Sequence, residues 1–372
     1  MQPSKIPERP RAREIGIQIG QLPTGTRNAM TDVPDVKVGH VTLVSGEGKL
    51  NPGEGPIRTG VTAILPHSGN LFREKVTATA HIINAFGKSI GLVQLLELGN
   101  IETPILLTNT LNVWKAADAL VDYVAAQNPG VYSFNPIVGE CNDSFLNDIL
   151  GRHVQRDHVF QALDTANHAN VQEGVVGAGV GMSGFGWKAG IGTASRLVKI
   201  RETTYTVGLL VLTNTGAASD LRIDGFPIGA QLNPQDISEA PAGSIMIIVG
   251  TDAPLSYRQL TRVAKRAAFG LARTGAIAAH GSGDFVIAFS TSNRVNAVPR
   301  GRDTEHPPFA DEASLTLFFR AVIEATEESI LNSLLKSYTV QGRDGNIRHG
   351  IPIRRALEIL NLNPPIPFPF DV

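Results

Sequence analysis

Short, almost continuously apolar runs rich in β-branched and aliphatic residues most constrain how this chain can fold. They predict buried strands, because a strand covered on both faces loses the alternation of apolar and polar residues. The runs lie at residues 61–65, 105–107, 205–212, 244–249 and 285–289. Residues 80–86, by contrast, look more like the end of a helix than a buried strand.

Between these runs, apolar residues recur at helical spacing. Residues 113–124 carry one apolar face, and residues 312–336 carry another. Ser256 and Gln259 have the spacing of a capping box, so a helix is predicted to begin at Ser256 and continue to about Leu271. Strands with helices outside them predict a layered α/β protein.

The composition excludes several classes of function. The chain has 372 residues, a formal net charge of -1 and 42% hydrophobic residues, which is typical of globular proteins. No basic stripe suggests a nucleic-acid partner. No apolar run is long enough to span a membrane, and residues 1–13 lack the apolar stretch of a secretory signal, so we expect a cytoplasmic protein without a membrane partner. The single cysteine, Cys141, cannot form an internal disulfide.

The junction between Gly243 and Ser244 carries the sharpest chemical signal. Residues 232–243 are predicted to be an exposed loop that leads into the strand at Ser244. Glycine at 243 leaves the Ser244 hydroxyl free to attack the preceding carbonyl. Hydrolysis of the resulting ester would free an N-terminal serine, whose α-amine, with a pKa of about 7.7–8.0, could serve as its own base. Taken alone, Gly-Ser before a strand is also typical of an ordinary junction.

Several motifs in one order extend this interpretation over nearly the whole chain. They are NAMTDVPDVKVGH at residues 28–40, GIGTASR at 190–196, GS at 243–244, TDAPL at 251–255, ARTG at 272–275 and GSGDF at 281–285. With these motifs the chain resembles the L-aminopeptidase/D-alanine esterase–amidase family, which includes the β-aminopeptidases.

The resemblance implies a four-layered α-β-β-α sandwich, similar in plan to other N-terminal-nucleophile hydrolases but different in strand connectivity. Length alone favours about two domains, whereas the resemblance implies a single domain over residues 1–372. It also implies an inactive precursor that cleaves itself into residues 1–243 and 244–372, which stay together. Cleaved protomers of the family form homotetramers, so we expect a homo-oligomer.

Ser282 and Asp284 stand two residues apart at the start of a predicted strand, so their side chains should share a face. In the family, a second serine and an acidic residue support the nucleophile. The resemblance therefore implies that Ser282 hydrogen-bonds Ser244 or its amine and that Asp284 orients Ser282. Some members have glutamate at this position, and the side chain of Asp284 has a shorter reach than glutamate. Without the resemblance, a turn capped by the two residues is the simpler interpretation.

Two further polar residues have roles that the resemblance implies. Asn214 follows the strand at 205–212, where its amide could stabilise an oxyanion, although Asn near Gly is also a common turn residue. Glu140 would bind the free amine of the substrate through a charge-assisted hydrogen bond, or else be a solvated loop acid. Some members add an aromatic hydroxyl nearby. Asn142 occupies that position here and gives that role no support.

Other sites are less favoured. The nine histidines contain no H-E-x-x-H motif, so we expect no metal, and the glycines at 177–181 fit no nucleotide-binding motif, so we expect no cofactor. His280 could complete a Ser-His-Asp triad with Ser282, but the amine of Ser244 already supplies a base. Residues 87–91 match the G-x-S-x-G elbow, for which a turn is the preferred interpretation because no buried strand is predicted before them.

We therefore expect a self-processing serine aminopeptidase that releases N-terminal residues from peptides, amides or esters. The family uses small L-residues, D-alanine derivatives and β-amino acids. A related amide hydrolase or acyltransferase is one alternative, although such enzymes use threonine at the junction where this chain has Ser244. A catalytically silent homologue is the other alternative.

Overall fold

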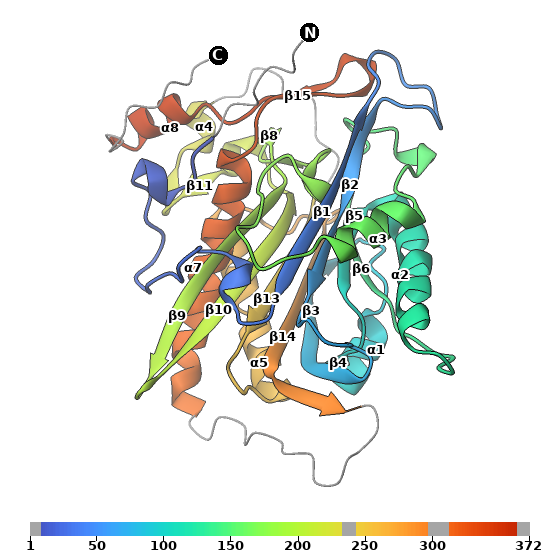
Figure 1. Ribbon diagram of the computed structural model, residues 1–372. Coiled ribbons are helices and arrows are strands. Elements are labelled where there is room, and N and C mark those ends of the chain that lie inside the picture. The colour runs from blue at the N-terminus through green and yellow to red at the C-terminus, as the bar shows by residue number, and fades with distance from the viewer. Residues whose placement is uncertain (1–8, 233–242, 297–311, 363–372) are drawn as a thin grey trace.

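Two β-sheets lie face to face at the centre of the protein, and helices cover their outer faces (Figure 1). The structure is a computed structural model that describes residues 9–232, 243–296 and 312–362. The order of layers is helices, sheet, sheet, helices. This arrangement confirms the predicted α-β-β-α sandwich.

The smaller sheet has four strands. Their order is β1 (Lys37–Ser45), β2 (Ile57–Leu65), β5 (Ile105–Asn109) and β6 (Ile137–Cys141). Strands β5 and β6 are parallel, and the other neighbours are antiparallel. Helices α2 (Val113–Gln127) and α3 (Arg156–Asp164) cover its outer face. Between them lies a core of small and aliphatic residues that includes Val61, Leu106, Leu120 and Val159.

The larger sheet has six strands. Their order is β4 (Asn100–Ile101), β3 (Glu74–Ala85), β14 (Gly283–Asn296), β13 (Ser244–Thr251), β10 (Thr203–Asn214) and β9 (Ile191–Ile200). Strands β13 and β14 run parallel at its centre, and every other neighbouring pair is antiparallel. Helices α5 (Tyr257–Ala264), α6 (Ala267–Arg273) and α7 (Leu315–Leu335) pack on its outer face.

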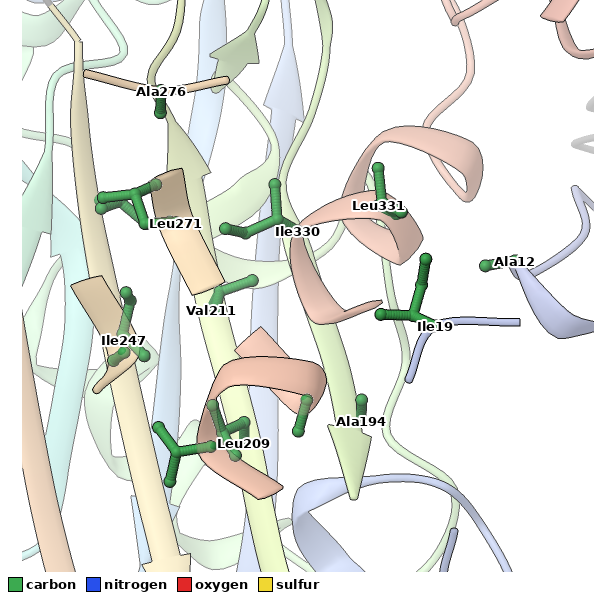
Figure 2. Close-up of a cluster of buried hydrophobic side chains, with 14 of the residues drawn as sticks. Ala12, Ile19, Ala194, Leu209, Val211, Ile247, Leu271, Ala276, Ile330 and Leu331 are labelled. Carbon is green, nitrogen blue, oxygen red and sulfur yellow. The ribbon is translucent and has the colours of Figure 1, made fainter. Parts of the chain in front are cut away.

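Two apolar cores enclose the six-stranded sheet. Figure 2 shows the outer core, where Val211 of β10 and Ile247 of β13 lie beside Ile330 of α7 and Leu271 of α6. The inner core fills the space between the sheets and includes Ile64, Leu107, Met246, Ile248 and Ile287. Because both faces of β13 are covered, every residue of that strand is buried, which explains its uninterrupted apolar run.

All five predicted strands are confirmed within β2, β5, β10, β13 and β14. The helix predicted from Ser256 starts there, with the Ser256 hydroxyl accepting a hydrogen bond from the amide of Gln259 at 3.3 Å. It is interrupted, however, and forms α5 and α6 instead of one helix. The prediction that residues 80–86 end a helix is wrong, because residues 80–85 belong to β3 and pair with β14.

Apart from single-turn 3-10 helices, the remaining elements are short α-helices and hairpins. They are helices α1 (Leu92–Leu98), α4 (Gly229–Leu232) and α8 (Ile353–Ile359), and the hairpins β7 (Ser183–Gly184) with β8 (Trp187–Lys188), β11 (Arg222–Ile223) with β12 (Phe226–Pro227), and β15 (Val340–Gln341) with β16 (Ile347–Arg348). Most of the loop predicted at 232–243 lies outside the described residues. None of the helices in the described residues is long and apolar enough to cross a membrane.

Candidate active site

The register of the six-stranded sheet places Ser244 between two other candidate positions. Ser244 is the first residue of β13 and pairs with Asn214, the last residue of β10. On its other side it pairs with Gly283, the first residue of β14. The site therefore lies at the edge where one strand ends and two parallel strands begin.

The amide of Gly283 contacts both partners of the predicted cleavage reaction. It lies 3.2 Å from the Ser244 Oγ and donates a hydrogen bond to it. The same nitrogen lies 3.3 Å from the carbonyl oxygen of Gly243 and donates to that oxygen as well. A backbone N–H fixed in a sheet is a preorganised donor for an oxygen that gains negative charge.

Gly243 itself lies against the end of β10. A Cβ atom at this position would lie 2.5 Å from the carbonyl oxygen of Asn214 and 2.5 Å from the Cα of Thr215. The sequence suggested glycine as a way to leave the hydroxyl uncrowded. The structure adds a more specific reason, since only glycine fits beside the β10 backbone.

Ser282 and Asp284 contact each other as their spacing predicts. The Ser282 hydroxyl donates a hydrogen bond of 2.7 Å to Oδ1 of Asp284, and both side chains are buried. Burial raises the pKa of Asp284 to about 6, although the Ser282 hydroxyl and the Ile245 amide act in the opposite direction. Within the described residues Ser282 makes no hydrogen bond to Ser244. The implied hydrogen bond from Ser282 to the Ser244 hydroxyl is therefore absent from the described residues, and the other implied partner, a free amine at residue 244, would exist only after cleavage.

The carboxamide of Asn214 is fixed on both sides. Its Oδ1 accepts a hydrogen bond of 2.8 Å from the amide of Ser183. Its Nδ2 donates one of 3.1 Å to the carbonyl oxygen of Asn142. Because an amide nitrogen carries two hydrogens, one N–H of Asn214 is not used by these two contacts.

Glu140 lies at the end of β6 and is buried rather than solvated, with 2% of its surface exposed. Its Oε1 accepts a 2.8 Å hydrogen bond from the amide of Lys88, and its Oε2 accepts from the hydroxyl of Thr110. A Cβ on Gly87 would lie 3.2 Å from Oε1 and 2.5 Å from the Phe285 ring. Glycine at 87 therefore lets the chain pass close to this carboxylate.

Asn142 contributes through its backbone. Its side chain turns back to its own loop, where Oδ1 accepts from the amide of Ser144 at 2.9 Å. Its carbonyl oxygen is the group that Asn214 contacts. The structure thus gives Asn142 a part in positioning Asn214, and the side chain is already engaged within its loop.

Sequence reasoning missed two buried charged residues beside Asn214. The Lys188 ammonium donates to the carbonyl oxygens of Gly179, at 3.0 Å, and Ala189. Burial lowers the pKa of Lys188 well below its usual range, while the charge of Asp143 acts to raise it. Burial raises the pKa of Asp143 to about 7 despite its hydrogen bonds to neighbouring side chains. A lysine inside the run GFGWKAGIG was the available signal.

These two residues flank both groups that hold Asn214. Asp143 follows Asn142 in the chain, and Lys188 pairs with Ser183 in the hairpin of β7 and β8. The Asp143 and Lys188 side chains therefore belong to the segments that position the Asn214 amide.

The other candidate residues do not assemble a second site. His280 is exposed, and its ring lies 6.3 Å from that of Phe86. Ser89 of the elbow-like motif lies 3.6 Å from the Met246 sulfur. Contrary to the expectation, a strand does precede this motif, since β3 ends at Ala85. Throughout residues 9–232, 243–296 and 312–362, no cluster of His, Cys, Asp and Glu could hold a metal ion.

Known proteins are similar to this chain in both sequence and fold. The model of peptidase family S58 matches residues 28–348. The β-peptidyl aminopeptidase BapA of Sphingosinicella microcystinivorans is 43% identical over 369 residues, covering 95% of this chain and 92% of that protein. The PH0078 protein from Pyrococcus horikoshii OT3 is 50% identical with a TM-score of 0.90, covering 95% of this chain and 99% of its own.

A third similar protein is described as a prototype of the serine aminopeptidases and as a variant of the N-terminal-nucleophile hydrolase fold. It is the L-aminopeptidase D-Ala-esterase/amidase of Ochrobactrum anthropi, 33% identical with a TM-score of 0.88, covering 95% of this chain and 98% of its own. These findings confirm the resemblance that the motifs suggested. The family model spans most of the sequence, and the chain therefore belongs to peptidase family S58.

Proposed function

We propose that this chain is an aminopeptidase that cleaves itself between Gly243 and Ser244 and then uses Ser244 as its nucleophile. One observation carries the proposal. The Gly283 amide contacts both the Ser244 hydroxyl, at 3.2 Å, and the Gly243 carbonyl oxygen, at 3.3 Å. The attacking group and the group to be attacked thus meet at one donor.

Self-cleavage would proceed by attack of Oγ on the Gly243 carbonyl carbon. The Gly283 N–H stabilises the oxyanion as the new C–O bond forms. The C–N bond then breaks, and the Ser244 nitrogen takes up the proton released by the hydroxyl. Water hydrolyses the resulting ester, which gives residues 1–243 with a terminal carboxylate and residues 244–372 with a free amine.

In the cleaved enzyme the same groups would act on a substrate. The amine of Ser244, with a pKa of about 7.7–8.0, takes the proton of Oγ during attack. The Gly283 amide and the second N–H of Asn214 stabilise the oxyanion. Ser282, oriented by Asp284 at 2.7 Å, accepts a hydrogen bond from the amine and fixes its direction. Water then releases the acyl group.

Glu140 would bind the free amine of the substrate. Its carboxylate is buried beside Gly87 and the Phe285 ring, close to Gly283. A charge-assisted hydrogen bond to an ammonium group contributes roughly 1.5–3 kcal/mol, which accounts for exopeptidase specificity. The substrates are peptides, amides or esters that begin with a small L-residue, a D-alanine derivative or a β-amino acid, the last supported by the relative named a β-peptidyl aminopeptidase.

Intact mass measurement and N-terminal sequencing test the cleavage. We expect two fragments, the smaller beginning at Ser244. The variant Ser244→Ala should remain one chain and lose at least about a thousandfold in hydrolysis of aminoacyl p-nitroanilides, because it lacks the nucleophile. A fragment that begins elsewhere would remove Ser244 from this role.

The role of Glu140 is tested with alanine amide and its N-acetylated form. The wild type should prefer the free amine, and Glu140→Gln should narrow that preference by about tenfold or more. If the variant keeps the full preference, another group binds the amine. If the wild type turns over both substrates equally, a broader amide hydrolase is the better description.

Assembly of the cleaved protomers into a homo-oligomer is also part of the proposal and rests on the family resemblance alone. Light scattering after size-exclusion chromatography gives the mass of the assembly. If the measured mass is that of a single protomer, the protein is not a homo-oligomer, and the proposed chemistry of the site is unaffected.

A further inference from the structure

Residues 86–88 run along the proposed site from the nucleophile to the amine-binding carboxylate. The amide of Phe86 donates a hydrogen bond of 3.3 Å to the carbonyl oxygen of Ser282. A Cβ placed on Gly283 would lie 3.1 Å from the Cα of Gly87. The next amide, that of Lys88, donates to Glu140 at 2.8 Å. This segment therefore contacts both Ser282, next to the proposed oxyanion donor Gly283, and Glu140.

The side chain of Lys88 turns back along this border. Its ammonium lies 4.8 Å from the centroid of the Phe86 ring, although its own amide is beside Glu140. The cation thus lies beside the ring of Phe86, the residue whose backbone amide contacts Ser282. Phe86 is 57% exposed, so this cation–π contact lies at the rim of the site.

No acidic side chain in the described part of the chain neutralises Lys88. Its ammonium forms none of the ion pairs found there, and its neighbour across the Phe86 ring is the imidazole of His280. The segment thus has a carboxylate, that of Glu140, beside the Lys88 amide and an ammonium, that of Lys88, beside the Phe86 ring.

A substrate with its amine at Glu140 and its scissile carbonyl at Ser244 would extend toward the Phe86 ring. The part beyond the scissile bond is the leaving group. A dipeptide with a free C-terminus carries its carboxylate on that leaving residue, where it would meet the Lys88 ammonium.

We propose that Lys88 binds the terminal carboxylate of the residue after the scissile bond, which makes short peptide acids better substrates than the corresponding amides. This inference rests on the proposed function, because it takes the amine at Glu140 and attack at Ser244. It adds to the proposed function a preferred substrate class, short peptides with a free carboxylate, and a specificity-determining residue, Lys88.

Alanyl-alanine and alanyl-alanine amide test the inference, because they share the amine and the scissile bond and differ only in the terminal charge. The wild type should show a higher kcat/KM for the acid. In Lys88→Met, which keeps an unbranched stem over Phe86, this advantage should fall about three- to fivefold, mainly through KM for the acid. Lys88→Arg should retain most of it.

The matched control is Lys199→Met, which removes an exposed lysine of β9, where residue 199 pairs with Thr204. It should leave the ratio of acid to amide unchanged. In the wild type the advantage of the acid should also shrink as ionic strength rises, because salt screens exposed charges.

The two proposals fail in different ways. If Lys88→Met keeps the wild-type ratio, or if the cleaved wild type has no preference for the acid, the inference is overturned while the aminopeptidase stands. If the protein remains one chain and releases no N-terminal residue from any of these substrates, the proposed function fails, and the role of Lys88 fails with it.

Discussion

Two buried polar clusters lie beside the six-stranded sheet, and they differ in whether a cation lies beside the buried carboxylate. The first, here called the ion cluster, consists of Arg13, Arg196, Glu324 and Glu328 and joins β9 to α7 and the N-terminal segment. The second, the reactive cluster, consists of Ser244, Ser282, Asp284 and Asn214 at the edge where β13 and β14 begin.

In the ion cluster the buried carboxylates face guanidinium groups. Arg196 is fully buried, with Nε 3.1 Å from Glu324 and Nη2 2.6 Å from Glu328. Arg13 lies 2.9 Å from Glu328. Burial by itself would raise the pKa of Glu328, but Arg196 and Arg13 outweigh burial and hold that pKa below its usual range.

In the reactive cluster the buried carboxylate of Asp284 faces a hydroxyl instead of a cation. Its Oδ1 accepts from Ser282, and its Oδ2 makes no well-formed hydrogen bond within the described residues. Burial therefore prevails, and the pKa of Asp284 rises to about 6. In these two clusters the direction of the pKa shift differs because guanidinium groups lie beside Glu328 and none lies beside Asp284 among the described residues.

Removing the central cation should have the largest effect on stability. We expect Arg196→Met to lower the free energy of unfolding by about 3–5 kcal/mol, because it leaves two carboxylates buried with less compensation. Urea denaturation in a Ser244→Ala background, where the chain is expected to stay whole, measures this. Arg156→Met, which breaks an exposed ion pair with Asp122, is the control, with a change of about 0–1 kcal/mol. Equal losses in both variants would contradict the comparison.

Removing a polar group from the reactive cluster should affect turnover instead. For Asn214→Ala we expect kcat to fall roughly 10²–10³-fold with little change in KM, because an oxyanion donor acts mainly in the transition state. Steady-state kinetics on the cleaved enzyme measure both constants. A raised KM with intact turnover would assign Asn214 to substrate binding.

Neutralising Asp284 should have a smaller effect than the two substitutions above. It should raise the stability of the protein and lower its activity. The folded pKa of about 6 lies above the ordinary 3.8, so the folded state binds this proton more tightly. Stability should therefore fall as pH rises between these two values and stay lower above them. At pH 7, Asp284→Asn should raise the free energy of unfolding by about 1–2 kcal/mol while lowering kcat.

The pH profile of kcat separates this role from a purely structural one. In the wild type, kcat should rise with pH through about 6, because the ionised Asp284 is a stronger hydrogen-bond acceptor for the Ser282 hydroxyl than the protonated acid. That limb should be absent in Asp284→Asn. Identical profiles in the two enzymes would return the pair of residues to a simple turn.

Sequence alone predicted the apolar centre of the fold because strands buried on both faces, such as β13 and β10, have continuous apolar runs. It failed for β3, which begins Glu74-Lys75 and carries polar residues along its length, so its pairing with β14 has no local signature. The polar residues of β9 were equally uninformative, since Arg196 finds its partners on α7, more than a hundred residues away.

The same division applies to the site. The contact between Ser282 and Asp284 is local and followed from their spacing. The adjacency of Asn214 and Ser244 depends on strand register, which their spacing in the chain does not reveal. The partners of Glu140 come from two separate segments of the chain, through the Lys88 amide and the Thr110 hydroxyl. Without those contacts a buried Glu140 could not be distinguished from a solvated acid.

The N–H of Gly283, which Ser244 and Gly243 share, also determines at which stage of folding the proposed cleavage could occur. This donor reaches Ser244 only when β14 lies beside β13, and β14 pairs with β3 on its other side. A ribosome that has released the chain only as far as Ser244 has therefore made the nucleophile but not its oxyanion donor. Cleavage would thus act as a checkpoint: the bond breaks only in molecules that have completed the sheet, and misassembled copies stay whole and inactive.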